Sequence, residues 1–151
     1  MITVSGFNVK FSTFPGGEEY VKLEWAGRER NYLEETFITA RLTSSSEVMR
    51  LLMVTDALRR RGFRDISLNL GYVPYARQDR VCAEGESLSI KVFADLINSQ
   101  KYQNVEIYDP HSTVTPALLD NCGVCHPVDY MAVSDDRSFI KWLGGTQKME
   151  D

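Results

Sequence analysis

The sequence predicts an α/β fold in which helices cover both faces of a parallel sheet. Short apolar segments with the length of strands alternate with longer segments whose apolar residues recur at helical spacing. The strand-like segments are 37–42, 65–70 and 104–108, and the helix-like segments between them are 47–61 and 87–100. Strand–helix–strand alternation is typical of parallel sheets, because a crossover helix returns the chain to the start of the next strand.

A pair of half-buried strands precedes this region. Residues 7–11 and 20–25 each alternate apolar and polar side chains, which indicates strands with one buried face. Between them, Phe14-Pro15-Gly16-Gly17-Glu18 has the proline and glycines of a turn. We therefore expect a small antiparallel strand pair near the N-terminus.

The helices carry recognisable start and stop signals. Ser44 and Glu47 stand three apart before an apolar period, which is the capping-box pattern of a helix start. Gly62 can end that helix, and the basic residues 59–61 complement the negative end of its dipole. We prefer this structural role for the three arginines to an anion site. The second helix is expected to bury Leu88, Val92, Phe93, Leu96 and Ile97.

The last third of the chain continues the alternation. Thr115 followed by Pro116 is expected to cap a short helix, and residues 123–128 are expected to form a short strand. Ser134 would begin a final amphipathic helix that ends at Gly144 and Gly145. Its apolar residues are Phe139, Ile140, Trp142 and Leu143.

Composition narrows the class of protein. A chain of 151 residues fits one domain, and 43% hydrophobic with 25% charged residues is ordinary for a globular protein. Net charge is −4, which gives no reason to expect nucleic acid or an anionic membrane as a partner. No apolar run reaches the roughly 20 residues of a membrane span. Three cysteines and a start without the features of a signal peptide predict a cytoplasmic location.

Two loops that follow predicted strands carry chemically active side chains. The loop after residue 70 contains Arg77-Gln78-Asp79-Arg80, and arginine is suited to phosphate oxygens while glutamine can donate to or accept from a base edge. The alternative interpretation of residues 77–80 is an ordinary turn whose arginines pair with Asp79 or with neighbouring acids. Asp109 and His111 follow the strand 104–108 and could approach one divalent ion if the chain turns at Pro110. Together the loops predict a site for a metal-complexed nucleotide, since open α/β sheets bind ligands at the carboxyl ends of their strands.

A competing motif lies near the end of the sheet region. Cys122-Gly123-Val124-Cys125-His126 has the spacing of covalent haem attachment. That attachment takes place outside the reducing cytoplasm, and a zinc site would need Cys82 from a distant loop. We prefer ordinary buried thiols.

The segments Tyr72–Arg80, Leu88–Ser99 and Val105–Ser112 resemble the ribose-phosphate diphosphokinase family, also called PRPP synthetase. The turn Phe14–Glu18 and the segment Thr39–Arg60 match that family's order of motifs, so the resemblance covers roughly residues 10–122. It implies a Rossmann-like fold of the phosphoribosyltransferase type. It also implies a reaction in which ATP gives its diphosphate to ribose 5-phosphate with Mg²⁺, releasing AMP.

The resemblance also assigns roles to individual residues. Arg77 and Gln78 would hold ATP, and Asp79 and Arg80 would shape the loop. His111, supported by Asp109, would lie at the magnesium–ATP complex.

A second set of roles concerns the N-terminal turn. Phe14 and Glu18 would contact adenine across a subunit boundary, which implies a homo-oligomer. Gly16 departs from the family, which usually has aspartate there, and Val81 stands where many members have lysine.

Family members are about twice as long as this chain, and their second domain binds ribose 5-phosphate. Asp135 and Asp136 superficially resemble that domain's ribose-phosphate motif, but a helix N-terminus explains them better. We therefore expect residues 1–151 to form a single domain that resembles the amino-terminal, ATP-binding half, with the second domain absent. It would be inactive alone or would need a carboxyl-terminal half. The alternative is a non-catalytic subunit that assembles with a full-length enzyme.

Overall fold

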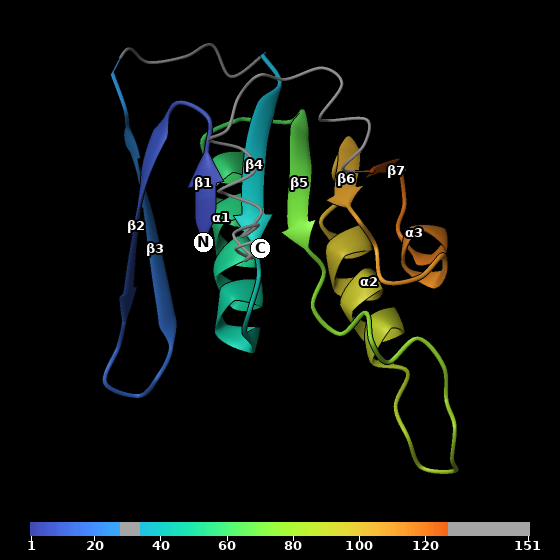
Figure 1. Ribbon diagram of the computed structural model, residues 1–151. Helices are drawn as coiled ribbons and strands as arrows, with labels where there is room; N and C mark the ends of the chain where they lie inside the picture. The colour runs from blue at the N-terminus through green and yellow to red at the C-terminus, as the bar shows by residue number, and fades with distance from the viewer. Residues whose placement is uncertain (28–33, 127–151) are drawn as a thin grey trace, which may run out of the picture.

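A computed structural model describes residues 1–27 and 34–126 of the chain. These residues form one mixed sheet of seven strands, with helices inserted between its later strands (Figure 1). The strands are β1 Ile2–Val4, β2 Phe7–Thr13, β3 Glu19–Trp25, β4 Thr36–Arg41, β5 Ile66–Tyr72, β6 Asn104–Tyr108 and β7 Cys122–Cys125. The helices are α1 Ser45–Arg60, α2 Ser89–Ser99 and α3 Val114–Leu118.

The strand order is β3-β2-β1-β4-β5-β6-β7. The strands from β4 to β7 are parallel, whereas β1, β2 and β3 join by antiparallel pairing. The predicted parallel sheet and the predicted antiparallel pair are therefore both present, within a single sheet. The strand β1 was not predicted, because three residues are too few to show a pattern; it fills the position between β2 and β4.

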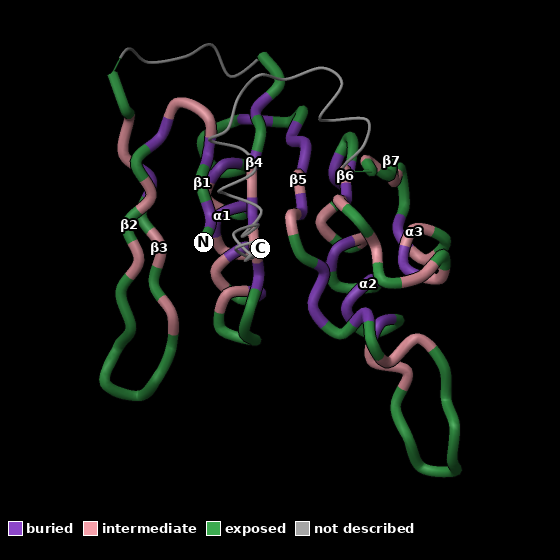
Figure 2. Tube along the Cα trace, viewed as in Figure 1, coloured by how far each residue is buried: buried purple, intermediate pink, exposed green. Residues whose placement is uncertain are grey.

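One face of the sheet carries the hydrophobic core. In register, Ile38, Leu68 and Val105 lie side by side on β4, β5 and β6, and all three are buried. Each of the connections through α1, α2 and α3 moves the chain one strand in the same direction, so right-handed crossovers place these three helices on that same face. Figure 2 shows buried residues concentrated in β4, β5 and the inner sides of α1 and α2. Among the described residues, helices therefore lie on only one of the two faces on which they were predicted, and the helix expected from Ser134 lies outside the described residues.

The start of α1 follows the predicted capping pattern with one change. The Ser44 hydroxyl accepts from the Glu47 backbone N–H at 3.2 Å. The Glu47 carboxylate, however, accepts from the backbone N–H and the hydroxyl of Thr43, at 2.6 and 2.9 Å, and from the Met1 ammonium at 2.7 Å. Burial alone would raise the pKa of Glu47, but these three donors together lower the pKa to about 2. The cap therefore ties the first strand to the first helix.

The arginines at the end of α1 are structural, as predicted. The Arg59 guanidinium donates to the carbonyl oxygens of Gln100 and Lys101, at 2.6 and 3.0 Å. The Arg61 guanidinium donates to the Leu23 carbonyl of the outer strand β3 at 2.7 Å and lies over the rings of Phe7 and Trp25. These contacts fix the end of α1 to strand β3 and to the segment that follows α2.

Two predictions about the later helices were wrong. In α2 the buried residues are Ile90, Phe93, Ala94 and Ile97, whereas Val92 and Leu96 are exposed. The sequence supports two apolar stripes on this helix, and the one that contains the smaller Ala94 faces the sheet. The short helix α3 begins after Thr113, so Thr115 is a buried residue within the helix and not its cap.

Candidate functional site

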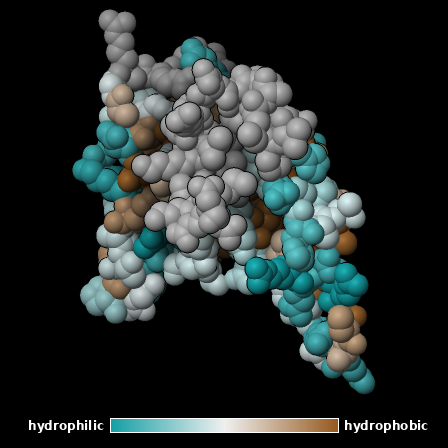
Figure 3. Space-filling view, viewed as in Figure 1, coloured by the Kyte–Doolittle hydropathy of each residue, from teal (hydrophilic) through white to brown (hydrophobic). Residues whose placement is uncertain are grey.

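The parallel arrangement of β4 to β7 brings the two predicted loops to one edge of the sheet. The loop after β5 spans residues 73–88 and the loop after β6 spans 109–113, and both leave carboxyl ends of neighbouring strands. Figure 1 shows both loops on the side to which the strand arrows point. Hydrophilic side chains gather on the loop between β5 and α2 in the lower right of Figure 3. This is the edge at which such sheets bind ligands.

The loop after β5 is anchored at its base before it reaches the arginines. Val73 and Ala76 are buried, which fixes the loop to the core. Tyr75 has a φ of 66°, a left-handed conformation that is uncommon for a tyrosine. Its carbonyl accepts from the Gln78 backbone N–H at 3.1 Å, and its hydroxyl lies 2.6 Å from the Ser45 hydroxyl at the start of α1. Strained backbone of this kind is concentrated at functional sites.

Asp79 lies where the two loops approach each other, and its side chain is only 9% exposed. The nearby Ser112 hydroxyl of the loop after β6, followed by the Arg80 guanidinium, lowers the pKa of Asp79 below its ordinary value. The alternative sequence interpretation, an internal arginine–acid pair, is therefore partly present, since Arg80 Nε lies 3.2 Å from Asp79. Asp79 thus packs at the base of its loop, and Arg77 remains exposed at the edge.

Asp109 and His111 are both exposed on the second loop. Asp109 has a φ of 46°, and its backbone N–H donates to the Cys125 carbonyl at the end of β7 at 3.1 Å, which anchors the start of the loop to the neighbouring strand. Among residues 1–27 and 34–126, no group of three or more His, Cys, Asp or Glu side chains gathers as a metal site. Mg²⁺ prefers oxygen ligands and often binds through one or two carboxylates, with water and substrate phosphates completing its shell, and Asp109 is the carboxylate of this loop.

The predicted turn between β2 and β3 is present but lies away from these loops. The Phe14 backbone N–H donates to the Glu18 carbonyl at 2.8 Å, and the Phe14 ring lies edge-on to Tyr20 with centroids 5.9 Å apart. β3 is four strand positions from β5, which corresponds to about 19 Å at about 4.8 Å per strand. Figure 1 shows the turn and the loop after β5 at opposite ends of one edge. Phe14 and Arg77 of the same chain are therefore too far apart to contact one ligand together.

Gly16 has a visible effect on this turn. A Cβ atom at position 16 would come within 3.0 Å of the Glu18 carboxylate. The glycine therefore leaves room for Glu18 to fold back over the turn.

The cysteine motif does not form a ligand pair. Cys122 and Cys125 stand three apart in β7, and successive side chains of a strand point to opposite faces, so the two thiols diverge. Burial raises the pKa of Cys122 to about 11, which keeps its thiol protonated. His126 is exposed beyond the end of the strand. The prediction of buried thiols was wrong, since Cys122 and Cys125 are only half-buried and Cys82 is exposed.

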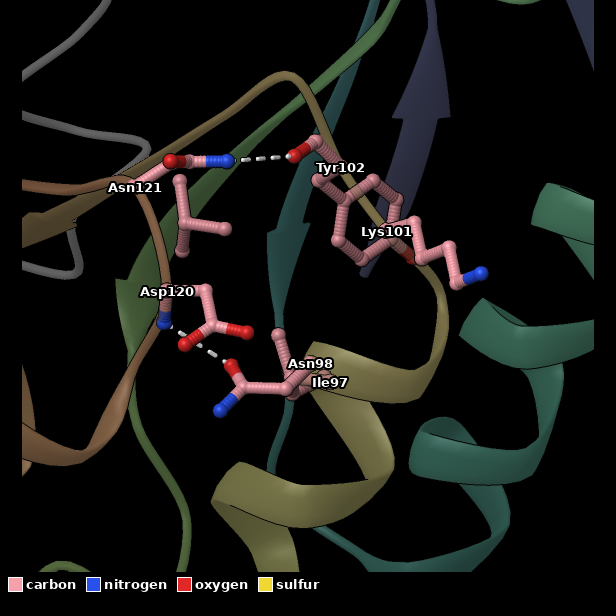
Figure 4. A pocket seen from close by; sticks show the side chains of 7 residues that line it. Ile97, Asn98, Lys101, Tyr102, Asp120 and Asn121 are labelled. Atoms are coloured by element: carbon pink, nitrogen blue, oxygen red, sulfur yellow. Dashed lines mark hydrogen bonds between the residues drawn. The ribbon is translucent and has the colours of Figure 1, made fainter.

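A pocket of about 210 Å³ lies at the opposite, amino-terminal edge of the sheet (Figure 4). Asn98 there accepts from the Asp120 backbone N–H at 2.9 Å and donates to the Leu118 carbonyl at 2.9 Å, and Asn121 donates to the Tyr102 carbonyl at 3.2 Å. The side-chain amides of Asn98 and Asn121 thus hold together the segments that precede β6 and β7.

Sequence reasoning missed three supporting residues at the carboxyl edge. Ser45 meets Tyr75, Ser112 meets Asp79, and Ser89 at the start of α2 donates to the side-chain oxygen of Gln78. Serines in loops and first helical turns carry little sequence signal, because capping explains them equally well.

Comparison with known proteins gives a consistent result. Residues 1–100 match the family model described as the N-terminal domain of ribose phosphate pyrophosphokinase. A ribose-phosphate pyrophosphokinase of Thermococcus kodakarensis is 33% identical over 107 residues, which are 71% of this chain and 36% of that protein. A chloroplastic ribose-phosphate pyrophosphokinase 2 of Spinacia oleracea is 33% identical over 131 residues, covering 82% of this chain and 32% of that protein.

A solved structure shares the fold. The phosphoribosylpyrophosphate synthetase of Mycobacterium smegmatis superposes with a TM-score of 0.66 at 24% identity, over 80% of this chain and 39% of that one. This chain spans about a third of the length of the curated relatives it matches. In the described part of the chain, no helix is long and apolar enough to cross a membrane. By its sequence and its fold, the chain belongs to the ribose-phosphate pyrophosphokinase family and corresponds to that family's N-terminal domain.

Proposed function

We propose that this chain provides the nucleotide-binding side of a ribose-phosphate diphosphokinase. The observation that carries the proposal is the placement of the two polar loops at the carboxyl ends of the neighbouring parallel strands β5 and β6. Arg77 is exposed on one of these loops and His111 on the other. Family membership supplies the reaction: ATP would donate its diphosphate to ribose 5-phosphate, and a ribose 5-phosphate domain would have to complete the enzyme.

The side chains present suit this chemistry. Transfer of a phosphoryl-type group depends on positioning and on neutralising charge more than on a covalent nucleophile. Arg77 would provide a forked cation for phosphate oxygens, and Asp109 with His111 would hold Mg²⁺ that arrives with ATP. Bound Mg²⁺ would supply further positive charge to the phosphates.

Phe14 and Glu18 would complete the site of a neighbouring copy. The separation of about 19 Å between β3 and β5 supports a role across a subunit boundary. Homo-oligomer formation and a cytoplasmic location are part of this proposal.

Calorimetry with Mg-ATP tests the nucleotide site. Arg77→Ala and His111→Ala should each weaken binding by about 1.5–3 kcal/mol, the usual loss for a charge-assisted contact. Arg60→Ala is a matched control, since Arg60 is exposed on α1 and pairs with Asp56 at 2.7 Å. Unchanged ATP affinity in both site variants would contradict the proposed site.

Activity separates the enzyme from the alternative of an interaction subunit. The 151 residues alone should release no AMP in response to ribose 5-phosphate, and adding a carboxyl-terminal half of the family should restore the reaction. AMP release by the pure chain would overturn the expected dependence on that half. Stable association with a full-length enzyme without Mg-ATP binding would favour the interaction subunit.

A further inference from the structure

The start of α2 is capped by the nucleotide loop and not by its own sequence. The residue before its first turn is Leu88, which has no polar side chain to accept from the helix, and no side-chain hydrogen bond caps this end. The main-chain carbonyl of Gln78 instead accepts from the Ile90 backbone N–H at 3.4 Å. Gln78 is therefore tied by its backbone to the first turn of the helix.

The side chain of Gln78 is tied to the same turn. The Ser89 hydroxyl donates to Gln78 Oε1, although serine at a helix start commonly accepts from the helix's own N–H groups. Ser87 Oγ lies 3.1 Å from Ser89 Oγ and donates to it, because the single Ser89 proton is already given to Gln78. Two serines thus form a chain of hydrogen bonds that ends on the amide oxygen.

The hydrogen bonds from Ser87 to Ser89 and from Ser89 to Gln78 determine which group the Gln78 amide offers to a ligand. An amide side chain has an oxygen that accepts and a nitrogen that donates twice. With Oε1 held by Ser89, the Nε2 group points to the other side, and no hydrogen bond to another described residue occupies it. Gln78 is half-buried, so the group remains within reach of a ligand.

We propose that Ser89 is a positioning residue that holds Gln78 Oε1, so that Gln78 offers its Nε2 donor to an acceptor ring nitrogen of the base of the bound nucleotide. The inference rests on the proposed Mg-ATP site and makes it more specific. A ring nitrogen accepts from Nε2, whereas an exocyclic amino group would meet donor against donor. Gln78 would then favour bases that place an acceptor ring nitrogen opposite its Nε2 group.

The test compares Mg-ATP affinity by calorimetry in the full chain and in matched serine variants. Ser89→Ala should weaken binding about three- to tenfold, as expected for a lost neutral hydrogen bond, and Ser89→Thr, which keeps the hydroxyl, should restore it. Ser99→Ala is the control, because that hydroxyl donates to the Leu96 carbonyl at the far end of α2. Thermal unfolding of each variant separates loss of folding from loss of binding.

Binding of deaza analogues of ATP provides a second measurement, one that would not change if Ser89 had only a structural role. One of 1-, 3- or 7-deaza-ATP should bind more weakly than ATP to the unmodified chain, and this difference should disappear in Gln78→Ala and shrink in Ser89→Ala. Equal binding of all three analogues, or a difference that persists in both variants, would refute the inference while leaving the ATP site intact. Failure of the unmodified chain to bind Mg-ATP would overturn the proposed function, and this inference with it.

Discussion

A buried hydrogen bond between α1 and the connection from α2 to β6 should show a marked asymmetry when its partners are removed. Thr55 Oγ1 donates to the Leu51 carbonyl at 3.0 Å, and the Tyr102 hydroxyl, 2.5 Å away, donates to Thr55 Oγ1. Thr55 is 0% exposed and Tyr102 4% exposed, so water cannot replace either partner. The two side chains therefore depend on each other.

The expected free energies follow from which group is left unpaired. Thr55→Val leaves the Tyr102 hydroxyl buried without an acceptor, which should cost about 1–3 kcal/mol of unfolding free energy. Tyr102→Phe leaves Thr55 still bonded to Leu51 and should cost about 1 kcal/mol. In the double variant no buried donor is unpaired, so its loss should be smaller than the sum of the single losses.

Urea unfolding followed by circular dichroism measures these values, provided that the slope with urea stays the same in all four proteins. Additive losses would refute the reasoning. Alkaline pH offers a second check. Burial, opposed by the Thr55 hydrogen bond and by Arg59, raises the pKa of Tyr102 above its ordinary value of 10. The stabilisation from this tyrosine should be complete below pH 10 and fall as pH rises further, and Tyr102→Phe should remove that fall.

Further outcomes are expected at other positions. Glu47→Gln should lower the unfolding free energy by about 1–2 kcal/mol at pH 7, allowing for solvent screening of a carboxyl whose pKa is about 2 instead of 4.5. That loss should disappear between pH 4.5 and 2 in denaturant titrations, because the stabilisation requires an ionised carboxylate. Asp79→Asn should weaken Mg-ATP binding although Arg77 itself is kept, because the Asp79 carboxylate pairs with Arg80 in the same loop, and normal affinity would show that this carboxylate is dispensable. Phe14→Ala should leave the mass measured by light scattering unchanged but reduce ATP affinity, and unchanged affinity would remove Phe14 from the site.

Much of the fold could be predicted because its signals are local. The strand Asn104–Tyr108 is encoded by a continuous apolar pattern, and the helix Ser45–Arg60 by an apolar period that follows its cap Ser44. The face that α2 buries could not be predicted, since Val92 and Leu96 fit a helical stripe as well as Ile90 and Ala94 do. Only packing against the sheet decides between the two stripes.

The candidate site shows the same division. Arg77 and His111 could be expected at one edge from strand order alone, and both lie on loops there. The Ser89–Gln78 hydrogen bond could not, because it joins residues 11 positions apart through side-chain geometry that no periodic pattern encodes. The divergence of the two thiols also required a structure, since the predicted strand 123–128 left out Cys122, whereas β7 contains both cysteines.

The distance between the hairpin turn and the nucleotide loop has a thermodynamic consequence. If one copy's turn completes another copy's site, nucleotide binding and subunit association are linked equilibria, and each must strengthen the other by the same factor. Apparent affinity for ATP would then fall on dilution of the protein, with no change in any contact within a single chain. The β2–β3 hairpin would in this way make the concentration of the protein itself a determinant of nucleotide occupancy.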